Sequence, residues 1–144
     1  MGDELSDNTF DAEGTATIHV TGTAVADDAW QVMGSATRYH LDSHVSVPPG
    51  VTLAIGPGVE IETGSSFGDG YDFNIQGTVE MAESTLSGAT EVFVKSGGVL
   101  NLTDSALDGH WIEYQPGSAG DVIGNDFDTA TLHLFSPVTV ADNA

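Results

Sequence analysis

The residues of this chain best suited to chemistry are acidic side chains that recur at a fixed spacing. Asp108 and Asp128 lie twenty positions apart, and each directly follows a large apolar residue. Two carboxylates at a defined separation can cleave a glycosidic bond, and carboxylates also bind cations. Because the chain has 22 acidic residues, solvated surface acids are the favoured interpretation, with a cation site and a catalytic pair as the alternatives.

A second acidic pair, Glu60 and Glu80, has the same spacing and flanks equivalent apolar positions. Like charges on neighbouring strands repel, and bound cations or high salt relieve the repulsion. We therefore predict no catalytic residue. The only expected cofactors are inorganic cations, with Asp108, Asp128, Glu60 and Glu80 as their candidate ligands.

Basic residues and cysteines limit the other kinds of site. Arg38 and Lys95 are the only basic residues, and there is no cysteine. Nucleic acid and anionic membrane surfaces are excluded as partners, because both need a basic patch. No apolar run approaches the roughly 20 residues of a membrane span. His40 and His44 are close in sequence, but the break at 42–43 argues against a shared metal.

The formal net charge of −20 is itself informative. Such a charge destabilises a compact state through self-repulsion. In molar salt the Debye length falls to about 3 Å, and most of this repulsion is screened. We expect a protein from a high-salt environment, with an acidic, calcium-binding secreted protein as the alternative.

The elements that position the acids form an internal repeat of about 20 residues, carried by three apolar series. The first series is Leu53/Ile55, Phe73/Ile75, Val92/Val94, Ile112/Tyr114 and Leu132/Leu134. The second is Tyr39/Leu41, Val59/Ile61, Val79/Met81 and, with one extra residue, Val99/Leu102. The third is Val47, Phe67, Leu86, Leu107 and Phe127. The predicted core consists of the following members of these series: Leu53, Ile55, Val59, Ile61, Phe67, Phe73, Ile75, Val79, Leu86, Val92, Val94, Leu107, Ile112, Tyr114, Phe127, Leu132 and Leu134.

Spacing of two within each pair indicates strands, and glycine and proline between the pairs indicate turns. We predict an all-β fold, a single-stranded right-handed parallel β-helix (β-solenoid) with three short strands per coil and five to six coils. The expected coils are 31–50, 51–70, 71–90, 91–110, 111–130 and the partial 131–144.

The two ends of the chain are predicted separately from the helix at 31–144. Residues 1–30 do not repeat, and they are expected to be either a cap over the solenoid or an arm that reaches a neighbouring subunit. No capping helix follows the last apolar segment at 137–140. An open solenoid end has unpaired backbone groups, which are usually covered. We therefore expect another copy, another protein or a further domain to cover it.

Residues 45–61, with the sequence VSVPPGVTLAIGPGVEI, and the repeated Ser/Asn-x-Phe/Leu steps resemble the right-handed β-helix superfamily typified by pectate lyases. The resemblance covers residues 31–144 and implies the fold. Lyases of that superfamily use calcium held by aspartates together with a basic residue. Arg38 and Lys95 lie three predicted coils apart, and the net charge repels a polyanionic substrate. We therefore do not expect an enzyme.

The remaining expectation is a structural or assembly protein of a halophilic system that acts as an oligomer, with a trimer favoured. Its N-terminus is acidic and lacks the basic and apolar stretches of a secretory signal. A short chain beginning at Met1 favours a virion surface component, namely a capsid decoration, spike or tail fibre that binds itself and other structural proteins. The alternative is a module of a secreted or cell-wall surface protein, including one that binds carbohydrate.

Overall fold

The computed structural model describes residues 16–62, 71–88, 91–109 and 111–144, which form sixteen β-strands and no helix. The strands are β1 (Ala16–Thr23), β2 (Asp28–Trp30), β3 (Ala36–Val47), β4 (Thr52–Ile55), β5 (Glu60–Glu62), β6 (Asp72–Ile75), β7 (Thr78–Ala82), β8 (Thr85–Ser87), β9 (Glu91–Val94), β10 (Val99–Thr103), β11 (Ala106–Asp108), β12 (Trp111–Tyr114), β13 (Asp121–Ile123), β14 (Asp126–Asp128), β15 (Thr131–Leu134) and β16 (Thr139–Ala141). They stack as a parallel β-solenoid of about five turns, and the predicted fold is confirmed.

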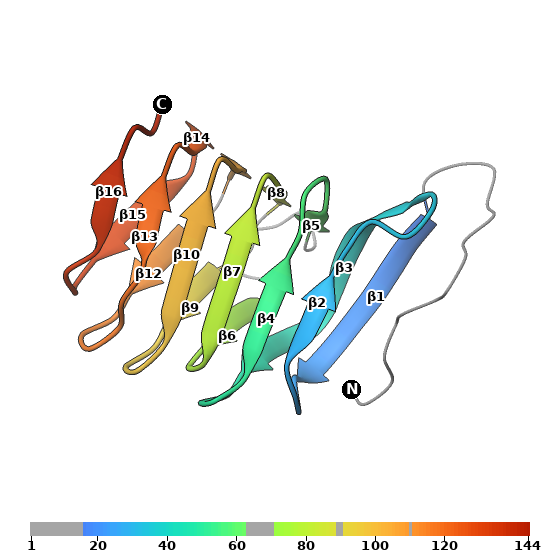
Figure 1. Cartoon of the computed structure of the whole chain (residues 1–144), viewed down its shortest axis with the longest axis horizontal. Helices are drawn as coiled ribbons and strands as arrows, with labels where there is room; N and C mark the ends of the chain where they lie inside the picture. The colour runs from blue at the N-terminus through green and yellow to red at the C-terminus, as the bar shows by residue number, and fades with distance from the viewer. Residues whose placement is uncertain (1–15, 63–70, 89–90, 110) are drawn as a thin grey trace.

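Each coil contributes strands to three faces. Face 1 consists of β2, β4, β7, β10, β13 and β16. Face 2 consists of the first half of β3 with β5, β8, β11 and β14, and face 3 of the second half of β3 with β6, β9, β12 and β15. In Figure 1 the strands of face 1 point upward at the front, the chain returns behind them, and it advances leftward to the C-terminus. This path is right-handed.

The stack extends to Ala16, so it begins earlier than the predicted residue 31. Strand β1 pairs in parallel with β3 along both halves, and β2 pairs with β4. Ile18, Val20 and Trp30 are buried in the common core. Residues 16–30 therefore belong to the solenoid and form its N-terminal edge, while residues 1–15 lie outside the described residues.

A fixed step of 20 residues holds in the C-terminal coils and fails near the N-terminal end. Phe73 pairs with Val92, as predicted, but its partner on the other side is Val45 rather than Leu53. Leu53 instead pairs with Val79 on face 1. The coil between β5 and β6 contains the additional segment 63–70, so counting 20 residues across it moves the alignment onto the wrong face. The segment itself, including Phe67, lies outside the described residues.

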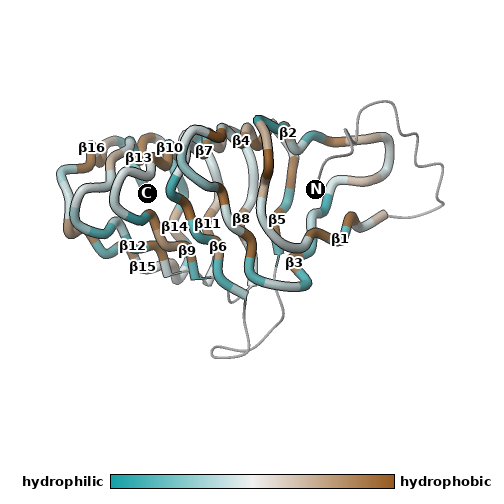
Figure 2. Tube along the Cα trace, turned by 90° about the horizontal axis from the view of Figure 1, so that it is seen from below, coloured by the Kyte–Doolittle hydropathy of each residue, from teal (hydrophilic) through white to brown (hydrophobic). Residues whose placement is uncertain are grey.

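Side chains alternate between the core and the surface along the strands. The hydropathy of the residues, drawn along the chain in Figure 2, changes from brown to teal within the strands. The predicted core residues buried in the structure are Leu53, Ile55, Val59, Ile61, Phe73, Ile75, Val79, Leu86, Val92, Val94, Leu107, Ile112 and Tyr114. Phe127 and Leu132 are only partly buried, and Leu134 is 42% exposed, because β14 and β15 are the outermost described strands of their faces. The inward pair of β10 is Leu100 and Leu102, so the predicted pair Val99/Leu102 is wrong at its first residue.

Buried aromatic side chains fill the wide parts of the core. The Trp30 ring stacks on Tyr39 at 5.0 Å and lies parallel to Phe73 at 6.1 Å between centroids. Tyr114 is fully buried, and its hydroxyl donates a hydrogen bond of 2.8 Å to the Leu100 carbonyl. Burial raises the pKa of Tyr114 well above that of a free tyrosine.

The turn between faces 1 and 2 has the same form in successive coils: a residue with positive φ is followed by a buried polar residue. Glu83, Asp104 and Gly124 have φ of 50°, 48° and 71°. Behind them Ser84, Ser105 and Asn125 stack in the interior, and this column is called the corner ladder below. The Ser105 amide donates to Asn125 Oδ1 at 3.0 Å, and Asn125 Nδ2 donates to the Leu102 carbonyl at 2.9 Å. The ladder satisfies backbone groups that the turn removes from the sheets.

Candidate functional site

The predicted pair Asp108 and Asp128 lies on neighbouring strands of face 2, where the two residues are in register. Both side chains are exposed, and the Thr129 hydroxyl donates to Asp108 Oδ1 at 3.3 Å. Across the described ranges, no group of three or more His, Cys, Asp or Glu residues is arranged to hold a metal ion. Asp108 and Asp128 are thus two neighbouring carboxylates on the protein surface.

The expected contact between Glu60 and Glu80 is wrong. Glu60 lies on face 2, in register with Arg38 and Thr85, whereas Glu80 lies on face 1. The additional segment 63–70 accounts for this error as well, because a count of 20 residues from Glu60 crosses it and ends on face 1 instead of face 2. Glu80 instead accepts two 3.0 Å hydrogen bonds from Asn101 Nδ2.

A charge ladder that the sequence did not reveal crosses β1, β3 and β5 at the N-terminal end of face 2. Its members are His19, Arg38, His40, Asp42, Glu60 and Glu62. Arg38 Nη2 lies 3.0 Å from Glu60 Oε2, and Arg38 Nε lies 3.4 Å from Glu62 Oε2. The hydrogen bond to Glu60 raises the pKa of the Arg38 guanidinium. The ladder ties the first coils together through partly exposed ion pairs.

The histidines complete this ladder. His19 Nδ1 lies 2.9 Å from Asp42 Oδ2, and His40 Nδ1 lies 3.1 Å from Glu62 Oε1. His44 is not part of the ladder, because it points to Asp72 on face 3, with Nδ1 3.4 Å from the carboxylate. The two histidines of the sequence motif thus face different carboxylates.

The two basic residues occupy different faces. Arg38 belongs to β3 on face 2, and Lys95 follows β9 on face 3. The Lys95 ammonium lies 4.9 Å from the centroid of the Phe93 ring, a cation–π contact. Within the part of the chain that the structure describes, neither residue has the surrounding aspartates that the lyase resemblance implies.

Face 1 differs from the other faces in charge. The outward side chains of β4, β7, β10, β13 and β16 are Thr52, Ala54, Thr78, Glu80, Ala82, Val99, Asn101, Thr103, Asp121, Ile123, Thr139 and Ala141. Two of these twelve are acidic. On β5, β8, β11 and β14 of face 2 five of eight outward residues are acidic, and on β6, β9, β12 and β15 of face 3 three of eight.

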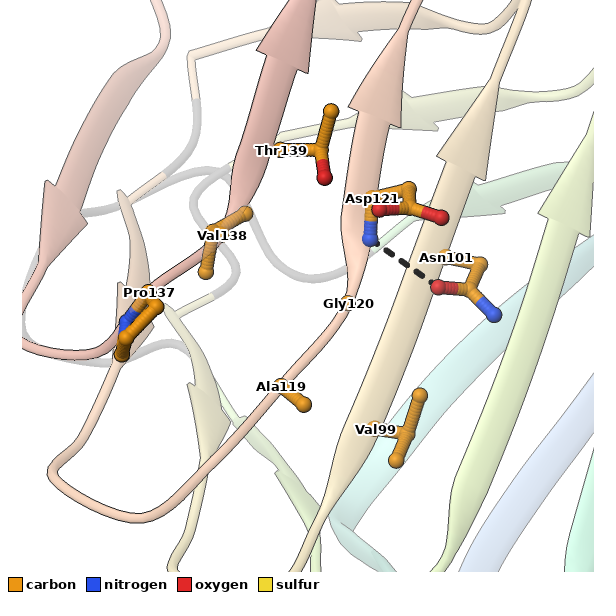
Figure 3. A pocket seen from close by; sticks show the side chains of 8 residues that line it. All are labelled: Val99, Asn101, Ala119, Gly120, Asp121, Pro137, Val138 and Thr139. Carbon is orange, nitrogen blue, oxygen red and sulfur yellow. Dashed lines mark hydrogen bonds between the residues drawn. The ribbon is translucent and has the colours of Figure 1, made fainter.

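Small side chains leave an open hollow of about 520 Å³ on face 1 (Figure 3). It lies over β10, β13 and the start of β16, and its floor includes Ala119 and Gly120. The Asp121 amide donates to Asn101 Oδ1 at 3.0 Å at one side of the hollow, and Pro137 and Val138 form the opposite side. The hollow is wide, shallow and without a basic group.

Face 3 has a different character, because it presents three half-buried rings and one exposed ring. We call Phe93, Trp111, His133 and Phe135 the aromatic strip. Trp111 and His133 stack at 3.8 Å between centroids with an interplanar angle of 14°, and His133 lies 6.5 Å from Phe135. Phe135 is 60% exposed. An apolar patch with a polar rim is characteristic of a binding surface.

Among the described residues, no helix has the length and apolarity needed to cross a membrane. Comparison of the chain with known protein families, with curated proteins and with solved structures found no match.

Proposed function

We propose that this protein is a non-enzymatic structural component that assembles with copies of itself, as a homotrimer, and with other structural proteins. The setting that we propose is a halophilic system, with the chain on the surface of a virion as a capsid decoration, spike or tail fibre. The observation that carries the proposal is the segregation of charge, with acids on faces 2 and 3 and a nearly neutral face 1.

Charge segregation favours self-association because a chain of net charge −20 repels its own copies on most approaches. Three copies that turn face 1 toward a common axis parallel to the solenoid keep the two acidic faces in solvent. Only Glu80 and Asp121 among the outward residues of β4, β7, β10, β13 and β16 then approach the axis. The hollow beside Ala119 offers room for a side chain of the neighbouring copy.

Molar salt favours the same trimer, because it screens the repulsion between the acidic copies. It shortens the range of the repulsion between copies to about 3 Å, so short-range packing at face 1 decides association. The resemblance to the pectate-lyase-like superfamily supports the fold and not lyase activity, because the two basic residues, Arg38 and Lys95, lie on different faces.

Mass by light scattering in about 2 M KCl tests the proposal. We expect three times the chain mass of 14.9 kDa. The face 1 variant Thr103→Glu adds a charge where the copies meet and is expected to give monomers. Thr85→Glu, the same change on an outward position of face 2, is the matched control and is expected to remain trimeric. A monomeric wild-type chain, or equal masses for both variants, overturns the proposal.

The second candidate is a module of a secreted or cell-wall surface protein that binds carbohydrate. The aromatic strip on face 3 favours this candidate, since rings at the surface beside hydrogen-bonding side chains suit a sugar. The gene neighbourhood separates the two settings. Adjacent virion genes favour the first candidate, and a longer parent gene with a secretory signal favours the second.

A further inference from the structure

Rings of the aromatic strip have polar side chains as their in-register neighbours along the solenoid axis. Phe93 lies in register between Asn74 and Glu113. Trp111 lies in register between Glu91 and Thr131. Neighbouring strands are about 4.8 Å apart, so rings and hydrogen-bonding groups follow one another at that spacing. A ligand lying along the aromatic strip meets an apolar surface and a polar group in turn.

This alternation matches the chemistry of a pyranose. One side of a sugar ring presents C–H groups, which pack on the electron-rich face of an aromatic ring. The hydroxyls at its edge need both donors and acceptors, and the strip is flanked by amides at Asn74 and Gln115 and carboxylates at Glu91 and Glu113. The three strands β9, β12 and β15 span about 10 Å, the length of two linked sugar rings.

Charge decides between classes of ligand. A polyanion is repelled by a chain of net charge −20. A cationic ligand would find the Phe93 ring already occupied by Lys95, whose ammonium lies 4.9 Å from its centroid. A ligand without charge is not repelled, and it can pack at Trp111 and Phe135 while the Lys95 contact with Phe93 stays in place. Its binding is insensitive to salt.

The geometry points to a binding site for a neutral oligosaccharide on the aromatic strip, with the sugar chain running along the solenoid axis. This inference rests on the second candidate function and is independent of assembly through face 1. Trp111 supplies the central ring, Phe135 extends the apolar surface toward the C-terminus, and the flanking amides and carboxylates orient the hydroxyls.

The two tryptophans make the test specific. Trp30 is 1% exposed in the core, whereas Trp111 lies at the surface, so the protein has two indole N–H resonances in distinct environments. The ¹⁵N-labelled full chain in KCl is titrated with cellohexaose, laminarihexaose, mannohexaose and chitohexaose. At least one of these is expected to shift the Trp111 resonance and leave that of Trp30 in place. The shift is expected to be the same at about 1 M and 3 M KCl.

Two substitutions identify the surface. Trp111→Ala and the more exposed Phe135→Ala are each expected to weaken binding about tenfold or more, measured by calorimetry. Thr85→Ala, at an outward position of face 2, is the matched control and keeps wild-type affinity. Circular dichroism checks that each variant is folded.

Several results overturn the inference. They are the absence of binding to all four hexasaccharides and unchanged affinity in folded Phe135→Ala. A loss of trimer mass in Phe135→Ala without any glycan binding also overturns it and assigns the strip to contact between copies. Absence of binding or unchanged affinity leaves the mass of Thr103→Glu unaffected, so failure of the glycan site is distinguishable from failure of the assembly proposal.

Discussion

Tyr114 shows how a single polar atom is accommodated within the solenoid. Its hydroxyl has the Leu100 carbonyl as its partner at 2.8 Å, and the surrounding core excludes water. A buried phenolate would lose its hydration, and Asp121 would repel it, so the folded chain holds the proton more firmly than the unfolded chain.

This difference predicts a stability change at alkaline pH. The contribution of Tyr114 is fully present below about pH 10, the pKa of an unfolded tyrosine. It is lost as the pH rises further toward the folded pKa, because only the unfolded chain then releases the proton. Tyr114→Phe removes this term and also leaves the Leu100 carbonyl unpaired, which costs about 1–3 kcal/mol at neutral pH.

Urea unfolding at pH 7 and again above pH 10 checks this expectation. The wild-type chain is expected to be more stable at pH 7, and its advantage over Tyr114→Phe to shrink as the pH rises. A constant difference between the two proteins over this range contradicts the role assigned to the phenol.

Burial of single residues could be predicted from the sequence, whereas contacts between outward residues could not. Alternation along a strand is a local property, so Ile75, Val94 and Ile112 were assigned to the core from spacing alone. The stacking of Trp111 on His133 depends on the register between coils and on ring orientation. No signal in the chain marks those rings as neighbours until the coil length is known.

At the scale of elements, the corner ladder holds successive turns in place. The amide of Asn125 reaches the Leu102 carbonyl, and its oxygen accepts from the Ser105 amide. The side chain is 1% exposed, so water cannot replace either bond.

Asn125→Ala is therefore expected to cost about 2–4 kcal/mol of unfolding free energy, since it leaves a buried donor and a buried acceptor without partners. Urea unfolding in high salt measures the loss. Asn101→Ala is the control, because Asn101 makes its hydrogen bonds at the surface. We expect the control to lose less than about 1 kcal/mol. Equal losses in both variants would show that the corner ladder has no special role.

The elements themselves were predicted with uneven success, for a physical reason. Glycine and proline in the turns mark where strands end, so the three-strand coil could be read from the sequence. The segment 63–70 has the same turn-like composition as the short connections and gives no sign of its extra length. The pairs Leu53 with Val79 and Glu60 with Thr85 were missed for that reason.

At the scale of the whole molecule, the acidic faces make stability depend on salt. Face 2 carries Asp108, Asp126 and Asp128 on adjacent strands, with Asp104 at the nearby corner, and all four side chains are exposed. Their mutual repulsion extends about 10 Å at 0.1 M salt and about 3 Å at 1 M.

The unfolding free energy is accordingly expected to rise steadily with KCl concentration, as followed by thermal or urea unfolding. The variant in which these four aspartates are replaced by asparagine is expected to be more stable than wild type at low salt and to gain less from added KCl. A variant that keeps the full salt dependence would exclude repulsion on face 2 as its origin.

The pairing of each coil with only the coils before and after it has a consequence for how such chains diverge. Duplicating or deleting one internal segment of about 20 residues replaces one set of neighbours with an equivalent set and leaves the cross-section unchanged. The length of the rod then changes in increments of about 4.8 Å. Related genes could therefore differ in solenoid length by whole coils, while face 1 and the aromatic strip keep their width.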